Sequence, residues 1–464
     1  MRVEKDTLGE VRVPDEALWG AQTQRAVENY PISGLREHPV FIRAFVILKK
    51  AAALANRELG VLDDVIAQAI VKACDRILGD FRTFRPHFVV DVFQAGAGTS
   101  FNMNVNEVIA NLANLSLGGR VGEYKPVHPN DHVNMAQSTN DVFPTAIRLA
   151  GLLLLEQLYP PLHALAEALD ERGEAFATVI KSGRTHLQDA VPVTLGQEFR
   201  AYAAATRRAT KLLHEAAEEL RVLGIGGTAA GTGINTPVGY RFAVVRQLSE
   251  LAGIELHATD DLREAMQSQL PVVAVSAALR NLALELTRIT NDLRLLASGP
   301  QTGLAEIILP AVQPGSSIMP GKVNPSMLEC MNQVLFHIIG ADTAIAYASQ
   351  AGQLELNVMM PLMAFELTFA IEILKNYLPV FVEKCIRGIE ADRDVCESYY
   401  ISSPSLVTAL NPIIGYAAAA EIAKESAKTG QRIPDLLRER NLLPEEKIAE
   451  IFTPEFLAGQ ADRR

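Results

Sequence analysis

The loop at residues 315–325 concentrates groups that can do chemistry. It reads Gly-Ser-Ser-Ile-Met-Pro-Gly-Lys-Val-Asn-Pro. Its glycines and prolines set a backbone path that regular helices and strands cannot follow. Two hydroxyls, the ammonium of Lys322 and the amide of Asn324 are spaced along that path. Such a loop can bind a small carboxylate and remove a proton, whereas an ordinary surface turn seldom carries Ile, Met and Val between its polar groups.

Two further polar segments precede predicted helices. In the first, Thr99 follows two glycines, and the free backbone N–H groups of a helix start favour an anion there. In the second, residues 137–141 read Gln-Ser-Thr-Asn-Asp before a long apolar stretch, so we expect one side chain to cap the helix and the others to bind. Simple helix capping is the alternative for both segments.

A fourth segment contributes an imidazole. Residues 183–189 read Gly-Arg-Thr-His-Leu-Gln-Asp. Among the nine histidines, His186 is the best candidate for a general acid or base, because Thr185, Gln188 and Asp189 can orient it. A purely structural histidine is the alternative.

Two patterns suggest a dinucleotide site and a metal site, but their sequence context argues against both. The glycine-rich residues 224–233 follow a helical segment and lack the strand-turn-helix context of a dinucleotide site. Residues 128–132, His-Pro-Asn-Asp-His, contain a proline that prevents a regular helical pair of histidines, and no third ligand accompanies them. We therefore expect no cofactor and no metal.

Long helical patterns must position these segments. Apolar residues recur at helical spacing over 44–78, with a break at Gly60 and Asp63, and again over 105–117. Longer patterns cover residues 141–159, 162–181, 195–223 and 261–298. Helices of this length predict a bundle. Two more, 327–352 and 361–388, are apolar around most of their circumference, which indicates a place at the bundle centre or against other subunits.

Composition limits the partners and the compartment. Hydrophobic residues make up 48% of the 464, and the net charge of −11 argues against a nucleic acid or an anionic membrane. An anionic substrate must then be attracted locally, with Lys322 and Arg184 as the first candidates. The four cysteines have no metal-binding or redox spacing, and the N-terminus has no signal-peptide pattern. We expect buried reduced thiols and a soluble cytoplasmic protein.

Taken together, these segments resemble the aspartase/class II fumarase superfamily over nearly the whole chain. Its members break a C–N or C–O bond and release fumarate. The loop at 315–325 resembles the superfamily signature, and the segments around Thr99, 137–141 and 183–189 resemble its other active-site motifs. The resemblance implies a mainly α subunit of three regions. Residues 1–138 would form a mostly helical N-terminal region, residues 139–393 a central helical bundle, and residues 394–464 a small helical C-terminal region. It also implies a homotetramer around the bundles, with each active site shared among three subunits.

The resemblance further implies a role for each polar residue. Ser316 corresponds to the catalytic base, and His186 belongs to the catalytic groups. Removal of a proton next to a carboxylate gives an aci-carboxylate, which the resemblance assigns to Ser138, Thr139 and Ser317. The other carboxylate is assigned to Thr185, Lys322 and Asn324, and the leaving group to Thr99, Asn140 and His186. A second anion site would use His128, Asn130 and Asp131.

The motifs that would lie nearest the substrate indicate which branch of the superfamily the chain resembles more. Residues 96–100, 137–140 and 351–357 resemble the branch that releases ammonia from L-aspartate. Residues 18–24, 127–131 and 226–228 resemble the fumarases, which release water from L-malate, and Met360 departs from both branches. We therefore expect an aspartate lyase, with a fumarase as the alternative. A non-catalytic helical scaffold is a third hypothesis, which predicts a damaged loop or a missing His186.

Overall fold

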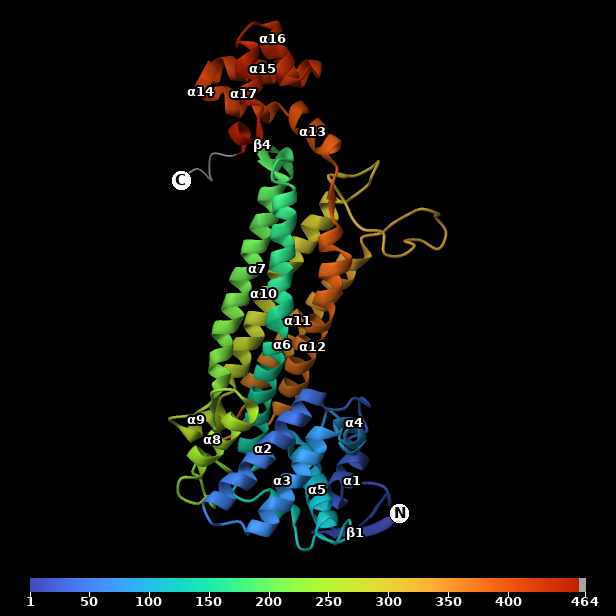
Figure 1. The fold of residues 1–464 in the computed structure, drawn as a ribbon, viewed down its shortest axis with the longest axis vertical. Helices are drawn as coiled ribbons and strands as arrows, with labels where there is room; N and C mark the ends of the chain where they lie inside the picture. The colour runs from blue at the N-terminus through green and yellow to red at the C-terminus, as the bar shows by residue number, and fades with distance from the viewer. Residues whose placement is uncertain (459–464) are drawn as a thin grey trace. The chain divides into compact units, whose positions relative to one another are not determined.

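The computed structural model describes residues 1–458, and helices make up most of them (Figure 1). The chain is therefore mainly α, as its apolar spacing predicts. Residue contacts divide it into two compact units. Unit 1 contains Met1–Tyr159, Lys211–Ala283 and Phe336–Leu374, and unit 2 contains Pro160–Thr210, Leu284–Leu335 and the chain from Lys375. The three consecutive regions stay a prediction, because contacts group residues by neighbourhood rather than by order.

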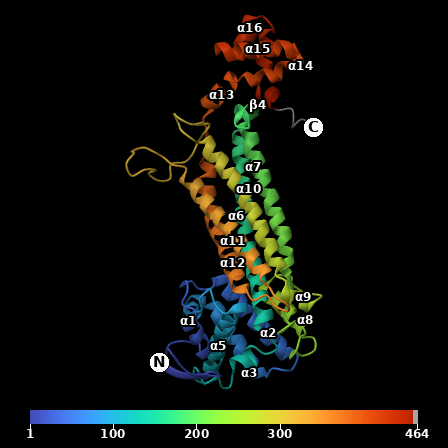
Figure 2. The ribbon, with the colours of Figure 1, turned by 180° about the vertical axis from the view of Figure 1, so that it is seen from behind.

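Unit 1 holds the N-terminal helices and two small sheets. Its helices are α1 Ala21–Asn29, α2 Pro39–Glu58, α3 Asp64–Gly79, α4 Phe81–Phe84, α5 Thr99–Ser116, α8 Tyr240–Ala252 and α9 Leu262–Gln267. Its strands are β1 Arg2–Asp6, β2 Gly9–Val13, β5 Val222–Leu223 and β6 His257–Ala258. Helices α2, α3 and α5 lie side by side in both views (Figures 1 and 2).

Unit 2 holds a hairpin, a two-residue sheet and the C-terminal helices. Its strands are β3 Ile180–Thr185, β4 Gln188–Thr194, β7 Ile307–Ile308 and β8 Glu390–Ala391. Its helices are α13 Arg393–Ser402, α14 Asn411–Ile414, α15 Tyr416–Thr429, α16 Ile433–Glu439, α17 Glu445–Ile451 and α18 Pro454–Leu457. The last four pack around an apolar cluster that includes Leu436, Leu437 and Ile422.

Five long helices contribute residues to both units. They are α6 Thr139–Ala175, α7 Leu195–Ala217, α10 Leu270–Leu296, α11 Ser326–Gln350 and α12 Met360–Lys384. Polar contacts join neighbouring helices within each unit. In unit 1, Ser276 of α10 donates to Asp342 of α11 over 2.7 Å, and in unit 2, Tyr377 of α12 donates to the Met327 carbonyl of α11 over 2.9 Å. These contacts confirm that the long helical patterns form a bundle.

Local sequence signals place several helix ends where they were expected. The break between α2 and α3 falls at Gly60 and Asp63. The Asp63 carboxylate accepts hydrogen bonds from the backbone N–H groups of Val65 and Ile66, at 2.9 and 3.1 Å, and so caps α3. Pro271 lies in the first turn of α10, where a proline costs no hydrogen bond.

The predicted break at Pro160 and Pro161 is wrong. Helix α6 runs without interruption from Thr139 to Ala175. The prolines lack the N–H groups that a helix would direct at residues 156 and 157, but both of those residues are exposed to solvent, so the helix can continue there. Residues 180–181, which were expected at the end of a helix, belong to strand β3 instead.

Two helices, α6 and α10, are long and apolar enough to cross a membrane by length and composition. The most apolar window of α6 is 83% buried in the protein, as a core helix of a bundle would be, and that of α10 is 44% buried. Buried bundle helices meet the same criterion, so this is weak evidence for a membrane. The cysteines are free thiols, of which Cys74, Cys385 and Cys396 are buried and Cys330 is half-buried.

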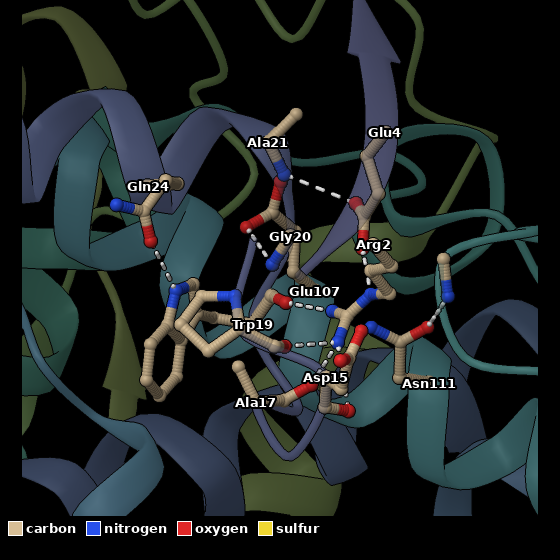
Figure 3. Close-up of polar contacts among 12 residues, drawn as sticks. Arg2, Glu4, Asp15, Ala17, Trp19, Gly20, Ala21, Gln24, Glu107 and Asn111 are labelled. Atoms are coloured by element: carbon tan, nitrogen blue, oxygen red, sulfur yellow. Dashed lines mark hydrogen bonds and ion pairs between the residues drawn. The ribbon is translucent and has the colours of Figure 1, made fainter. Parts of the chain in front are cut away.

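A buried carboxylate organises the start of α1 (Figure 3). Glu107 of α5 is 2% exposed, and it accepts hydrogen bonds from the backbone N–H groups of Gly20, Gln22 and Thr23 at 2.8, 3.0 and 3.2 Å. It also accepts one from the Thr23 hydroxyl at 2.5 Å. The first turn of α1 has no side-chain cap of its own, so Glu107 takes that role from a distant helix.

The first strand is joined to the same place. Glu4 accepts a hydrogen bond from the backbone N–H of Ala21 at 3.1 Å, and its other oxygen accepts one from Arg2 at 2.7 Å. Arg2 in turn donates to the carbonyls of Ala17 and Trp19, at 2.8 and 2.6 Å (Figure 3). The charged residues therefore link β1 to the segment before α1.

Replacing Glu107 by alanine should lower the free energy of unfolding by about 3 kcal/mol or more, because several buried donors lose their acceptor. Burial raises the pKa of Glu107 to about 7, from an ordinary value of 4.5. A raised carboxyl pKa means that the folded state binds the proton more tightly, so the stability it contributes is full below pH 4.5 and is lost as the pH rises through about 7. Glu107→Gln cannot titrate and should lack this pH dependence. Chemical denaturation of the three proteins between pH 5 and 8 measures both effects, and equal stabilities throughout would contradict them.

Candidate active site

The loop at 315–325 is closed by its own polar groups. The Gly315 N–H donates to the Lys322 carbonyl at 2.9 Å, and the Asn324 side-chain amide donates to the Gly315 carbonyl. A side chain at residue 315 would collide with the Lys322 carbonyl, so glycine is required by close approach. The Asn324 amide, expected to bind substrate, thus already serves to close the loop.

The Ser316 hydroxyl lies in a small nest of backbone donors. Its oxygen accepts hydrogen bonds from the N–H groups of Ile318 and Met319, at 3.2 and 3.0 Å. Two N–H dipoles directed at one oxygen stabilise negative charge on it. Ser316 is half-buried, and Ser317 and Lys322 are exposed.

The apolar residues of this loop are poorly covered by the rest of residues 1–458. Ile318 is 83% exposed, and Met319 and Val323 are about half exposed. The loop, drawn in gold, projects away from the helix ends of its unit (Figures 1 and 2). A cavity of about 340 Å³ lies beside Val323, Asn324 and Pro325, but its walls are mostly apolar and include the Asp392 carboxylate, which does not suit an anionic substrate.

His186 lies in a hairpin turn that the sequence analysis did not predict. Strands β3 and β4 pair antiparallel, and the two residues between them, His186 and Leu187, both have positive φ, at 56° and 57°. This is the backbone of a two-residue hairpin turn. Thr185, Gln188 and Asp189 are exposed with His186, and no hydrogen bond in residues 1–458 joins any of them to its ring. The orientation of His186 by these neighbours therefore stays a prediction.

A buried ion cluster supports the base of the hairpin. Lys181 is 1% exposed and contacts Glu198 at 2.8 Å and Glu306 at 3.0 Å. Arg184 contacts the same Glu306 oxygen at 2.9 Å. The guanidinium of Arg184 is therefore committed to a buried carboxylate, so it does not serve as the free cation expected for an anionic substrate. Lys322 stays the predicted cation for that role.

In unit 1, Thr99 is the first residue of α5 and is exposed. The N-cap is Gly98, in a left-handed conformation with φ of 84°, and it has no side-chain cap bond. Gln94 serves the helix start instead, because its side-chain oxygen accepts from the Phe101 N–H at 2.9 Å. The capping alternative for Thr99 is wrong, and its hydroxyl stays available for a ligand.

Aromatic packing places the starts of α5 and α6 together. The rings of Phe41 and Phe45 of α2 pack against Phe143 of α6 and Phe101 of α5, with centroids 5.1 and 5.3 Å apart respectively. Asn102 of α5 then donates to the Thr139 hydroxyl at 2.9 Å. Two polar segments that lie 38 residues apart, counted from Thr99 to Gln137, thus meet within one unit.

Every side chain from Ser138 to Asp141 makes a structural contact. Ser138 accepts from the Asn140 N–H at 3.2 Å, and Asp141 accepts from the Ser138 N–H at 3.0 Å, so both residues cap α6. The Asn140 amide donates to the Ala229 carbonyl at 2.8 Å. The expectation of a single capping residue is therefore wrong.

Asp141 also explains the glycine-rich segment at 224–233. Its second oxygen accepts from the N–H groups of Gly226 and Thr228, at 3.0 and 2.9 Å. Asp141 is fully buried, and burial raises its pKa to about 6 while these hydrogen bonds act in the opposite direction. The segment folds around a carboxylate of its own chain. It follows the two-residue strand β5, which pairs parallel with β6 beyond α8, so the expectation that no strand precedes it is wrong.

Residues 128–132 form a short helical turn, Pro129–Val133, closed by its histidines. The Nδ1 atom of His128 accepts from the N–H groups of Asn130 and Asp131, at 3.3 and 3.2 Å. That of His132 accepts from the His128 N–H at 2.8 Å. These nitrogens act as acceptors and cannot bind an anion, which leaves the His128 Nε2 atom and the exposed Asn130 for such a site. Residues 1–458 contain no group of three or more His, Cys, Asp or Glu that could hold a metal.

The sequence analysis also missed the buried ammonium of α2. Lys49 of α2 is fully buried and donates to the side-chain oxygens of Asn134 and Gln137, at 3.0 and 2.9 Å. The available signal was a lysine on the apolar side of a helix, beside Leu48 and Ala52, which are also fully buried. In unit 2, no hydrogen bond or ion pair of the described residues joins the hairpin to the loop at 315–325.

Comparisons with known proteins agree across the chain. A family model described as Lyase matches residues 9–340, and one described as Fumarase C C-terminus matches residues 406–459. The aspartate ammonia-lyase of Bacillus subtilis is 48% identical over 98% of this chain and 95% of its own length. That of Escherichia coli is 44% identical over 99% and 97%.

Solved structures of lyases are also similar to this chain over nearly its whole length. A fumarate lyase:delta crystallin from Brucella melitensis, bound to cobalt, has a TM-score of 0.94 and 48% identity, covering 97% of this chain and 98% of that one. A class II fumarase from Schistosoma mansoni has a TM-score of 0.92 and 35% identity, covering 98% and 99%. The backbone is thus shared more widely than the side chains.

Proposed function

The chain belongs to the aspartase/class II fumarase superfamily of lyases, and we propose that it reversibly eliminates ammonia from L-aspartate to give fumarate. The observation that carries this choice is sequence identity. It is 44 and 48% with two aspartate ammonia-lyases over nearly the whole chain, against 35% with a class II fumarase of the same fold. Because the fold is common to both activities, the side chains and not the backbone must separate them.

Ser316 is the proposed general base. A neutral serine is too weak to remove a proton from carbon, so its alkoxide must be stabilised. The N–H groups of Ile318 and Met319 supply part of that stabilisation, and the Lys322 ammonium in the same loop supplies charge. The proton leaves the carbon next to one carboxylate, whose oxygens take up the electron pair as an aci-carboxylate.

The aci-carboxylate then expels the amine. The electron pair returns to form the carbon–carbon double bond, and the C–N bond breaks on the opposite face. An amine that is bound as an ammonium leaves as neutral ammonia without a further proton, whereas hydroxide would need a proton donor to leave as water. Ser138, Thr139 and Ser317 are the proposed donors to the aci-carboxylate, which they must bind more tightly than the ground state.

The remaining polar groups bind the rest of the substrate. Thr185, Lys322 and Asn324 are proposed to hold the second carboxylate, and Thr99, Asn140 and His186 to surround the leaving group. The free hydroxyl of Thr99 at the start of α5 supports this assignment, since no capping bond occupies it. His128, Asn130 and Asp131 remain a possible second anion site in the proposal, limited to the atoms that the helical turn leaves free.

The protein should act as a homotetramer in the cytoplasm, with each site shared among three subunits. Exposed apolar side chains on the long helices support assembly, because they need a partner surface. They include Leu270 at 65%, Leu284 at 51% and Phe336 at 55% exposure. The uncovered Ile318 in the loop supports sharing of the site as well.

One assay tests the proposed substrate. Fumarate formation from L-aspartate and from L-malate should be followed by absorbance with the same enzyme preparation. We expect kcat/KM for aspartate to exceed that for malate by at least about 10²-fold, a lower bound, because sites that hydrogen-bond a polar group of the substrate can discriminate by roughly 10⁴-fold or more. The reverse ratio would establish the fumarase alternative, and absence of both activities would favour the scaffold.

A further inference from the structure

The buried ammonium of Lys49 holds the turn that precedes α6. It donates to the side-chain oxygens of Asn134 and Gln137, at 3.0 and 2.9 Å. The same two amides cross-link the turn. Asn134 donates to the Gln137 carbonyl at 3.2 Å, and Gln137 donates to the carbonyls of Val133 and Met135, both at 3.1 Å. Lys49 thus connects the rigid helix α2 to both ends of the turn.

This turn includes a strained residue. Ala136 has a positive φ of 60°, a left-handed conformation that is strained for a residue with a Cβ. Such a conformation persists only where surrounding contacts enforce it. The amides on either side of Ala136 are the two that Lys49 holds, so the lysine helps to keep the backbone in this conformation.

The network continues into the residues proposed to bind substrate. Asn102 of α5 donates to the Asn134 side-chain oxygen at 3.3 Å and to the Thr139 hydroxyl at 2.9 Å. Asn106, one turn further along α5, donates to the same Asn134 oxygen at 3.2 Å. Ser138, Thr139 and Asn140 follow the turn directly in the chain. Side chains of α2, α5 and the preceding turn therefore hold these three residues in place.

Burying the Lys49 ammonium costs free energy, so fold stability alone does not account for it. Both of its acceptors are neutral amides, and within residues 1–458 no carboxylate lies at ion-pair distance from it. Burial lowers the pKa of its ammonium to about 7, while the nearby Asp141 carboxylate acts in the opposite direction. Replacing a buried charge by an apolar side chain of similar size is often neutral or stabilising. A local cost of this kind points to a functional role.

We propose that Lys49 is a positioning residue, which orients Ser138 and Thr139 for the substrate carboxylate, and Asn140 for the leaving group, by fixing the turn at 134–137. The proposal rests on the proposed function, because that function places Ser138 and Thr139 on the carboxylate and Asn140 beside the leaving group. Lys49 acts through Gln137 and Asn134 and need not touch the substrate. Since the aci-carboxylate is the species that these donors must bind most tightly, misplacing them should affect kcat more than KM.

The test compares Lys49→Met with Lys50→Met. Lys50 is the adjacent lysine, but it is paired with Asp75 on the outside of the unit at 2.6 Å, so it controls for the loss of one charge from α2. Lys49→Met should lower kcat by about 10²-fold with KM changed by less than about threefold, as expected for catalytic groups displaced by about 1 Å. Lys50→Met should keep wild-type values. The melting temperatures of the two variants should agree closely.

Gln137→Met tests the other end of the same hydrogen bond and keeps the proposal testable should Lys49→Met fail to fold. It should lower kcat as Lys49→Met does, and the double variant should be no slower than the slower single variant, because all three variants lose the Lys49–Gln137 hydrogen bond that holds the turn. Multiplying effects would overturn the proposal. The proposal would also be overturned if the lost activity were explained fully by a smaller folded fraction of the variant, or if KM changed and kcat did not.

Hydrogen exchange separates this proposal from the proposed function. In the protein without substrate, backbone amides of residues 134–140 should exchange faster in Lys49→Met than in Lys50→Met. If the wild type converts neither aspartate nor malate, the proposed function fails, yet exchange still decides whether Lys49 fixes the turn. Equal exchange in the two variants would overturn the proposal whatever the activity.

Discussion

Ser316→Ala is expected to reduce kcat by at least about 10²-fold while substrate affinity and assembly remain nearly unchanged, because the substitution removes only the proton acceptor. The hydroxyl accepts two backbone N–H groups of an exposed loop, and water can replace it as their acceptor. The loop should therefore keep its shape, which the Gly315 and Asn324 contacts close independently.

The measurement is steady-state kinetics of fumarate formation, together with the binding of fumarate to each variant. Ser317→Ala is the matched control, since it removes the neighbouring hydroxyl, which is exposed and proposed to be one donor among several. It should cost clearly less in kcat than Ser316→Ala. Retention of more than about a tenth of kcat by Ser316→Ala would remove this residue from the role of base.

The second large effect is recovery of activity from two inactive proteins. Thr99→Ala and Ser316→Ala tetramers should each lack an intact site. If each site takes Thr99 and Ser316 from different subunits, an equal mixture that is refolded together should have both residues intact in about one quarter of its sites, since each donor chain is suitable with a probability of about one half. Activity should rise to about a quarter of the wild-type value.

Mass spectrometry must confirm that mixed tetramers form, and the residual activity of each unmixed variant is subtracted. A mixture of the same proteins that is not unfolded first serves as the control, because its subunits have not exchanged. Mixed tetramers without activity would mean that Thr99 and Ser316 act from one chain. The result does not depend on which substrate is correct, since either aspartate or malate can report it.

The sequence by itself determined the fold class, most helix ends and the residue types of the site. Helices are local structures. Their hydrophobic period, capping residues and termination signals can therefore be recognised within about ten residues of sequence, as at Gly60 and Asp63. The loop at 315–325 was recognisable for the same reason. Its glycines, prolines and hydroxyls specify a local backbone, and the resemblance to the lyase superfamily that it carries is confirmed by the family models.

Tertiary structure decided the outcome where a distant group competes with a local signal. Pro160 and Pro161 end a helix by local rules, but exposed residues and buried leucines on both sides let α6 continue. Arg184 looked free for a substrate until Glu306, 122 residues away, took its charge. Ser138 and Asp141 could each have been the only cap, yet Asp141 also holds a segment more than 80 residues away.

Lys49 shows the same limit most clearly. Its helix predicts only that a lysine faces the apolar side, and nothing nearby in the chain indicates a partner. Its acceptors lie 85 and 88 residues further along the chain. Folding buries the ammonium, and a buried charge must find hydrogen bonds wherever the chain brings them. Local sequence therefore determined which groups are available, and only the packing of α2, α5 and α6 decided which of them meet.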